Sequence, residues 1–109
     1  MMDDEECLFC RIVDNKEPAD IILDDDNYIS FYNRFTRHNG HALVIPKEDV
    51  CRVKDIKDMV AYTEFIYKVH NLIRKIYKPL YAEVKLEDGD KYKGNANHVH
   101  CHIILYYDS

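Results

Sequence analysis

Three histidines stand at alternate positions near the end of this 109-residue chain, in the segment HVHCHII that begins at His98. Successive side chains of a β-strand point to opposite faces, so His98, His100 and His102 would share one face, each roughly 6.6 Å from the next. A helix would scatter the rings, whereas the β-branched and aromatic residues around them favour a strand. The pattern therefore predicts a strand with one face that carries chemistry.

His100, at the centre of the row, is the best candidate nucleophile. Imidazole has a reference pKa of ~6.5, so a free ring nitrogen is available at pH 7 to attack an electrophile. His102 can then hydrogen-bond phosphoryl oxygens or a leaving group, and the upstream loop 93–97 offers backbone N–H groups and amides to a phosphate. Two plainer explanations stay open: a His-rich strand without chemistry, and a simple metal site, because short His tracts bind metals.

Composition and net charge limit the classes of protein to which this chain can belong. Hydrophobic residues make up 47% and charged residues 32% of the chain, and no apolar run approaches the ~20 residues that cross a bilayer. The net charge of −5 argues against nucleic acid polymers as partners, which need a basic surface, but leaves room for a single nucleotide. We expect one domain over residues 1–109 with a flexible acidic start at 1–6, located in the cytoplasm and also the nucleus, with no membrane partner.

Hydrophobic periodicity predicts five strands and two helices. A short helix is expected before Pro18. The expected strands cover residues 21–23, 28–32, 41–45 and 81–86, with the histidine segment as the fifth. Apolar residues at three-and-four spacing predict a long amphipathic helix over 55–77, which Pro79 ends. This order suggests an α+β domain with an antiparallel sheet and the helices on one face.

Cys7 and Cys10 form a Cys-x-x-Cys pair, which can hold one zinc ion together with two ligands from elsewhere. The candidate partners by residue type are His38, His41, Asp49, Cys51 and His98. An unmetallated buried pair is an open alternative. Redox chemistry is the weakest one, because no strand precedes the pair.

The histidine segment resembles the signature of the histidine triad (HIT) proteins, in which three histidines alternate with apolar residues and two further apolar residues follow. The resemblance extends to the Hint-like branch through three other segments in the same order: CLFCRIV at 7–13, ILDD at 22–25 and GHALVIPK at 40–47. It implies an α+β fold with a five-stranded antiparallel sheet, one long helix and one short helix. It also implies a homodimer whose two sheets join.

Resemblance to this branch implies a nucleotide hydrolase or nucleotidyl transferase that cleaves the P–N bond of purine nucleoside 5′-phosphoramidates and binds an AMP- or GMP-like nucleotide. By the same resemblance, His100 attacks the α-phosphorus and forms a nucleotidyl-histidine that water hydrolyses, while His102 contacts the phosphate. This chemistry needs no cofactor. The implied nucleotide-binding residues, with an asparagine where the family has a ribose-binding aspartate, are Phe9, Ile12, Phe31, Asn33 and Asn95.

The resemblance also maps a structural zinc site onto Cys7, Cys10, His98 and Asp49, the last standing where zinc-bearing members have a histidine. Glu87 falls where the family has an asparagine beside the phosphate. A carboxylate there would repel a phosphate, so either Glu87 turns away or turnover is weak. Two alternatives therefore stay beside the enzyme: a nucleotide-binding or scaffold protein with little turnover, and a zinc-stabilised interaction module.

Overall fold

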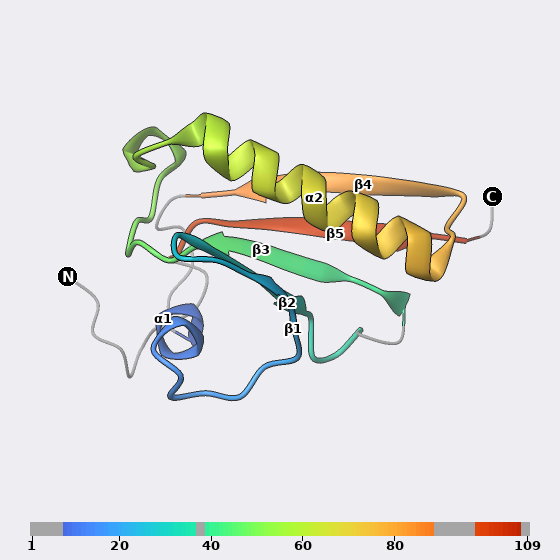
Figure 1. The fold of residues 1–109 in the computed structure, drawn as a ribbon, viewed down its shortest axis with the longest axis horizontal. Helices are drawn as coiled ribbons and strands as arrows, with labels where there is room; N and C mark the ends of the chain where they lie inside the picture. Colours follow the sequence, from blue (N-terminus) through green and yellow to red (C-terminus); the bar gives the residue numbers. More distant parts are fainter. Residues whose placement is uncertain (1–7, 37–38, 89–97, 108–109) are drawn as a thin grey trace.

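The computed structural model describes residues 8–36, 39–88 and 98–107. Its elements are α1 (Leu8–Val13), β1 (Ile21–Asp24), β2 (Tyr28–Tyr32), β3 (Ala42–Pro46), the short 3₁₀ turn η2 (Val53–Asp55), α2 (Met59–Tyr77), β4 (Tyr81–Glu87) and β5 (His100–Tyr106). The five strands form one antiparallel sheet in the order β1-β2-β3-β5-β4 (Figure 1). The predicted α+β fold is confirmed.

The position of β5 between β3 and β4 decides which side chains lie beside the histidines. In the pairing with β4, Glu87 lies opposite His100 and Lys85 opposite His102. Directly opposed residues of antiparallel strands point to the same face of a sheet. Glu87, the last residue of β4, therefore lies on the same face as His100.

The sheet is apolar on both faces, and a different helix covers each one. On one face, alternate residues of the central strands such as Val44 pack against α2. On the other face, Phe31 and Leu43 pack against Phe9 and Ile12 of α1. Figure 1 shows α2 along one side of the sheet and α1 on the other. The prediction that both helices lie on one face is wrong, because β2 and β3 are apolar at successive positions and need cover on both sides.

Capping residues set the ends of α2. Asp58 precedes the helix, and its side chain accepts a hydrogen bond from the Ala61 N–H (3.0 Å). Lys78 ends the helix in a left-handed conformation, φ 53°, and Pro79 follows. The predicted start near residue 55 is too early because η2 is a separate turn, whereas the predicted end is confirmed. Within the described ranges, α2 and α1 both fall short of the length and apolarity that crossing a membrane requires.

Tyr62 links α2 to the centre of the sheet. Its side chain is fully buried, and its hydroxyl donates to the Val44 carbonyl at 2.7 Å. We expect Tyr62→Phe to lower the free energy of unfolding by about 1 kcal/mol, because it deletes one buried hydrogen bond and keeps the ring. Urea unfolding measures this loss, with Tyr67→Phe, an exposed tyrosine of the same helix, as the matched control. Equal midpoints for the two variants would contradict the assigned bond.

Candidate functional site

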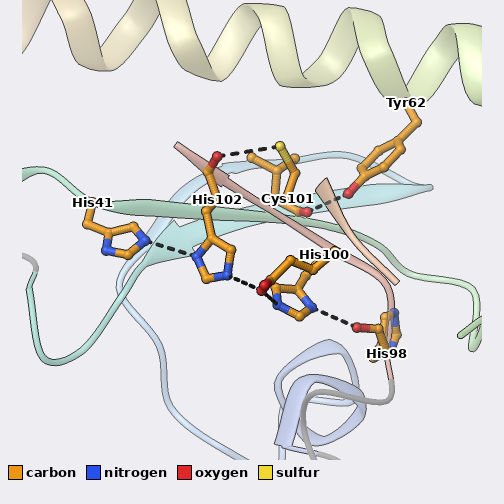
Figure 2. A network of polar contacts seen from close by, with 8 residues as sticks. His41, Tyr62, His98, His100, Cys101 and His102 are labelled. Carbon is orange, nitrogen blue, oxygen red and sulfur yellow. Dashed lines mark hydrogen bonds and ion pairs between the residues drawn. The ribbon is translucent and has the colours of Figure 1, made fainter. Parts of the chain in front are cut away.

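His100 and His102 lie on the sheet face opposite α2, which we call the histidine face, and His98 lies just before the strand (Figure 2). The strand therefore begins at His100, and the prediction that His98 is part of it is wrong. His98 and His100 are buried, while His102 is partly exposed. The backbone N–H of Val99 donates to the Val50 carbonyl (2.9 Å). This bond holds the segment before β5 against the chain that leaves β3.

His100 is oriented by its own backbone neighbourhood. Its Nδ1 lies 2.9 Å from the carbonyl oxygen of His98. A carbonyl oxygen only accepts, so Nδ1 carries the proton and Nε2 of the neutral ring holds a lone pair. The ring of Phe9 packs edge-on against the imidazole, with 5.2 Å between centroids. His100 is therefore held in one tautomer, with the nucleophilic nitrogen defined.

A row of polar contacts runs behind His102. Thr36 Oγ1 lies 2.8 Å from His41 Nδ1, and His41 Nε2 lies 3.0 Å from His102 Nδ1. His102 Nε2 lies 2.8 Å from a carboxylate oxygen of Glu87. Because the carboxylate accepts, His102 donates from Nε2, His41 donates from Nε2 to His102, and the Thr36 hydroxyl donates to His41. Each donor meets an acceptor while both rings stay neutral.

The pKa values of the two rings agree with this assignment. Burial, with a smaller contribution from His102, lowers the pKa of His41 from 6.5 to about 4. Burial also lowers the pKa of His102, against the opposing effect of its hydrogen bond to Glu87. Both imidazoles are therefore neutral near pH 7. Figure 2 shows the contacts of His41 with His102 and of His100 with the His98 carbonyl.

Glu87 turns into the site. Its Oε1 lies 3.0 Å from His100 Nε2 and 2.8 Å from His102 Nε2. Burial acts to raise the pKa of this carboxyl, but hydrogen bonds and electrostatic interactions with His102 and His100 outweigh it, and the pKa lies below its ordinary value. Glu87 is therefore a carboxylate at neutral pH. Of the two possibilities left by the sequence, the one in which Glu87 turns away is wrong.

A cavity of about 700 Å³ opens beside these groups, within the range of small-molecule sites. Its apolar wall includes Phe9, Ile12, Phe31 and Leu43, and its polar lining includes Glu17, Asp20, Asn33, Arg34, Glu87, His100 and His102. The side-chain oxygen of Asn33 accepts a hydrogen bond from the Phe35 N–H (2.9 Å). The NH₂ group of the same side chain is the part of Asn33 that can donate to a ligand. The cavity thus joins an apolar slot to the histidine face.

A second cluster, the Cys10 group, gathers Cys10, Asp49 and His98 with their donor atoms within 4.8 Å of one another. His98 Nε2 donates to the Pro46 carbonyl (2.8 Å), so its Nδ1 holds a lone pair, 3.4 Å from Cys10 Sγ. Cys10 Sγ lies 3.6 Å from Asp49 Oδ1. Nitrogen and sulfur donors on one tetrahedral zinc ion are about 3.5 Å apart. The three donors fit such an ion.

A sequence model of the HIT domain matches residues 14–108 of this chain. The chain belongs to the HIT family. It is 30% identical over 101 residues to the adenosine 5′-monophosphoramidase hnt1 of Schizosaccharomyces pombe, covering 90% of this chain and 72% of that protein.

Solved structures give the same fold. A HIT family member from Bacillus subtilis matches this HIT domain with a TM-score of 0.82 and 28% identity, over 94% of this chain and 74% of that chain. A Zn-bound histidine triad protein from Mycobacterium smegmatis matches with a TM-score of 0.78 and 25% identity, over 96% and 78%.

The structure brings most of the predicted site residues of this HIT domain to two places. The cavity collects four predicted nucleotide-binding residues and two histidines, and the Cys10 group collects three predicted metal ligands. Cys7, His38 and Asn95 lie outside the described residues. Among the described alternatives for zinc, His41 lies against His102 instead of Cys10, and Cys51 is not part of the Cys10 group.

Sequence reasoning missed the contact of His41 with His102 and the bridge formed by Glu87. Both could have been found from the sheet order, since His41 precedes β3 and Glu87 ends β4, the two strands beside β5. Cys101, between the two histidines in sequence, faces α2 instead. Burial raises the pKa of its thiol to about 12, so this cysteine is unreactive at neutral pH.

Proposed function

We propose that this HIT domain hydrolyses the P–N bond of purine nucleoside 5′-phosphoramidates through a nucleotide bound covalently to His100. One observation carries the proposal: the bond from His100 Nδ1 to the His98 carbonyl leaves a lone pair on Nε2, on a residue that lines a nucleotide-sized cavity. The activity named for the fission yeast relative supports the same reaction.

The reaction takes two displacements. In the first, His100 Nε2 forms a bond to the α-phosphorus as the bond to the leaving nitrogen breaks. His102 gives that nitrogen a proton from Nε2 and regains one at Nδ1 from His41, whose half-buried ring takes up a proton from solvent. In the second displacement, water attacks the phosphorus, the P–Nε2 bond breaks, and the water proton leaves through the same histidines. The products are an amine and a nucleoside 5′-monophosphate.

The walls of the cavity suit the two ends of a nucleoside. Phe9, Ile12 and Phe31 form an apolar slot for the base. Asn33, through its NH₂ group, hydrogen-bonds a ribose hydroxyl. A role for Asn95 on the phosphate side stays a prediction.

The nucleophile is tested with His100→Ala and a fluorogenic adenosine 5′-phosphoramidate. We expect kcat/KM to fall roughly 10³-fold or more, as when other enzymes lose a nucleophile. His70→Ala, a histidine of α2 outside the cavity lining, is the control. Acid quenching and mass spectrometry should also find a nucleotide on the peptide that contains His100. Equal rates for the wild type and His100→Ala would exclude this mechanism.

A second function, nucleotide binding with little turnover, is favoured by the position of Glu87. A substrate phosphate has to displace the carboxylate from His100 Nε2 and then lie beside it. Two unit charges 4 Å apart repel by about 4 kcal/mol at an effective dielectric constant of about 20, and partial exposure of Glu87 reduces this. The carboxylate therefore slows the first displacement.

Glu87→Asn measures this barrier. We expect kcat/KM for the phosphoramidate to rise about tenfold, because the variant removes the negative charge and frees Nε2. The control is Glu83→Asn, which makes the same charge change on the same face of β4, two strand repeats from Glu87. A fall in kcat/KM for Glu87→Asn alone would show instead that the carboxylate takes part in catalysis.

We also propose a structural zinc ion held by Cys10, Asp49 and His98, with Cys7 as the fourth ligand. The convergence of three donors and the zinc in the mycobacterial neighbour support it. Such an ion would tie α1 to the segment before β5 and would take no part in the phosphorus chemistry.

Metal analysis of purified, untagged protein tests the zinc site. We expect about one zinc ion per chain, loss of this ion in Cys10→Ser, and its retention in Cys51→Ser. The second variant is a matched control because Cys51 lies near Asp49 in sequence but outside the Cys10 group. Equal zinc content in the two variants would contradict the assignment.

The predicted homodimer rests on the sheet edges. β4 is an edge strand, and its residues Tyr81, Val84 and Leu86 are exposed. An unpaired, partly apolar edge can pair with a second copy of the chain. The homodimer and the predicted location stay predictions.

A further inference from the structure

We propose that Glu87, His100 and His102 form a second metal site, distinct from the Cys10 group, that binds a divalent first-row transition ion such as Zn²⁺ or Co²⁺. The three side chains offer one carboxylate oxygen and two imidazole nitrogens, and these atoms all lie within 4.8 Å of one another. Carboxylate and imidazole are ligands that such ions accept together. We call these residues the Glu87 group.

The spacing of the donors is close to that of a bound ion. Glu87 Oε1 lies 3.0 Å from His100 Nε2 and 2.8 Å from His102 Nε2. Nitrogen and oxygen ligands bind zinc at about 2.0–2.2 Å, so on a tetrahedral ion they are about 3.3–3.5 Å apart. The donor atoms at each contact would have to move apart by only a few tenths of an ångström to admit the ion. The backbone need not move, because β4 and β5 already hold Glu87 opposite His100.

The contact between Glu87 and His100 calls for a positive charge. In the neutral form of the His100 ring, the only proton is given to the His98 carbonyl, so Nε2 presents a lone pair. The carboxylate of Glu87 also presents lone pairs, so in that neutral form two acceptors face each other at 3.0 Å. An ion between them binds both. A proton on Nε2 is the competing solution, and it yields an ordinary ion pair.

The outer contacts of both rings suit metal ligands. A histidine that binds a metal through one nitrogen usually donates from the other to a fixed acceptor. His100 already donates from Nδ1 to the His98 carbonyl. When His102 binds through Nε2, its proton sits on Nδ1 and is donated to His41 Nε2, and His41 donates from Nδ1 to Thr36 Oγ1. Each ring keeps one proton, so these two histidines release none.

Occupancy of this site and the proposed reaction exclude each other. The ion takes the lone pair of His100 Nε2, which the reaction needs for phosphorus. Three protein ligands leave at least one position of a tetrahedral ion open, on the side of the cavity that all three residues line. The site is therefore of the open kind.

Titration of the full-length, untagged protein with Co²⁺ distinguishes the two sites by absorption. Cobalt on the Cys10 group gives a sulfur-to-metal charge-transfer band, because Cys10 is a thiolate when bound. Cobalt on the Glu87 group gives only the weak visible bands of a nitrogen and oxygen site. We expect both signals in the wild type and in Glu83→Gln. In Glu87→Gln we expect the affinity of the thiol-free site to fall at least about tenfold, with the thiolate signal unchanged.

Two outcomes would overturn the proposal. One is a wild-type protein that shows no thiol-free cobalt signal, in which case the Glu87–His100 contact is an ion pair. The other is an equal signal in the wild type and Glu87→Gln. His100→Ala provides a second variant and should lose the same signal, and circular dichroism verifies that each variant is folded. The readout is metal binding alone, so it does not depend on whether the protein hydrolyses phosphoramidates.

Discussion

The antiparallel register of β5 between β3 and β4 is the constraint on which the site depends. It places His100 and His102 on one face, Glu87 directly across from His100, and His102 beside His41, which precedes β3. A shift of one residue would turn both imidazoles toward α2 and bring Cys101 to the cavity. Burial of Cys101, Ile103 and Leu105 under α2 opposes that shift.

Several parts of the fold follow directly from the sequence. Alternation of histidine with apolar residues identifies β5, and three-and-four spacing identifies α2 up to its end before Pro79. The start of α2 is less certain from periodicity, since Ile56 is buried although it lies outside the helix. α1 packs on the sheet face that α2 leaves uncovered. That is a property of the assembled strands, which local patterns do not report.

The site shows the same division. Residue type and spacing predict His100 and the cysteine pair, because each motif is short and local, whereas the apolar residues of the slot are predicted only by the resemblance to the family. The orientation of Glu87 is a side-chain conformation chosen by hydrogen bonds across β4 and β5, and an alignment gives its position only. The His41 contact joins residues that are 61 positions apart in the chain. Such pairs become visible only when the strand order is known.

The short helix α1 has consequences for cooperativity. Six residues are too few for a helix to persist alone in water, so its order comes from what it packs against. The same helix supplies Phe9 and Ile12 to the cavity and Cys10 to the donor cluster on its other flank. If a ligand seated at either place orders this shared segment, occupancy of one place would strengthen binding at the other, and thermodynamic linkage would make the effect equal in both directions.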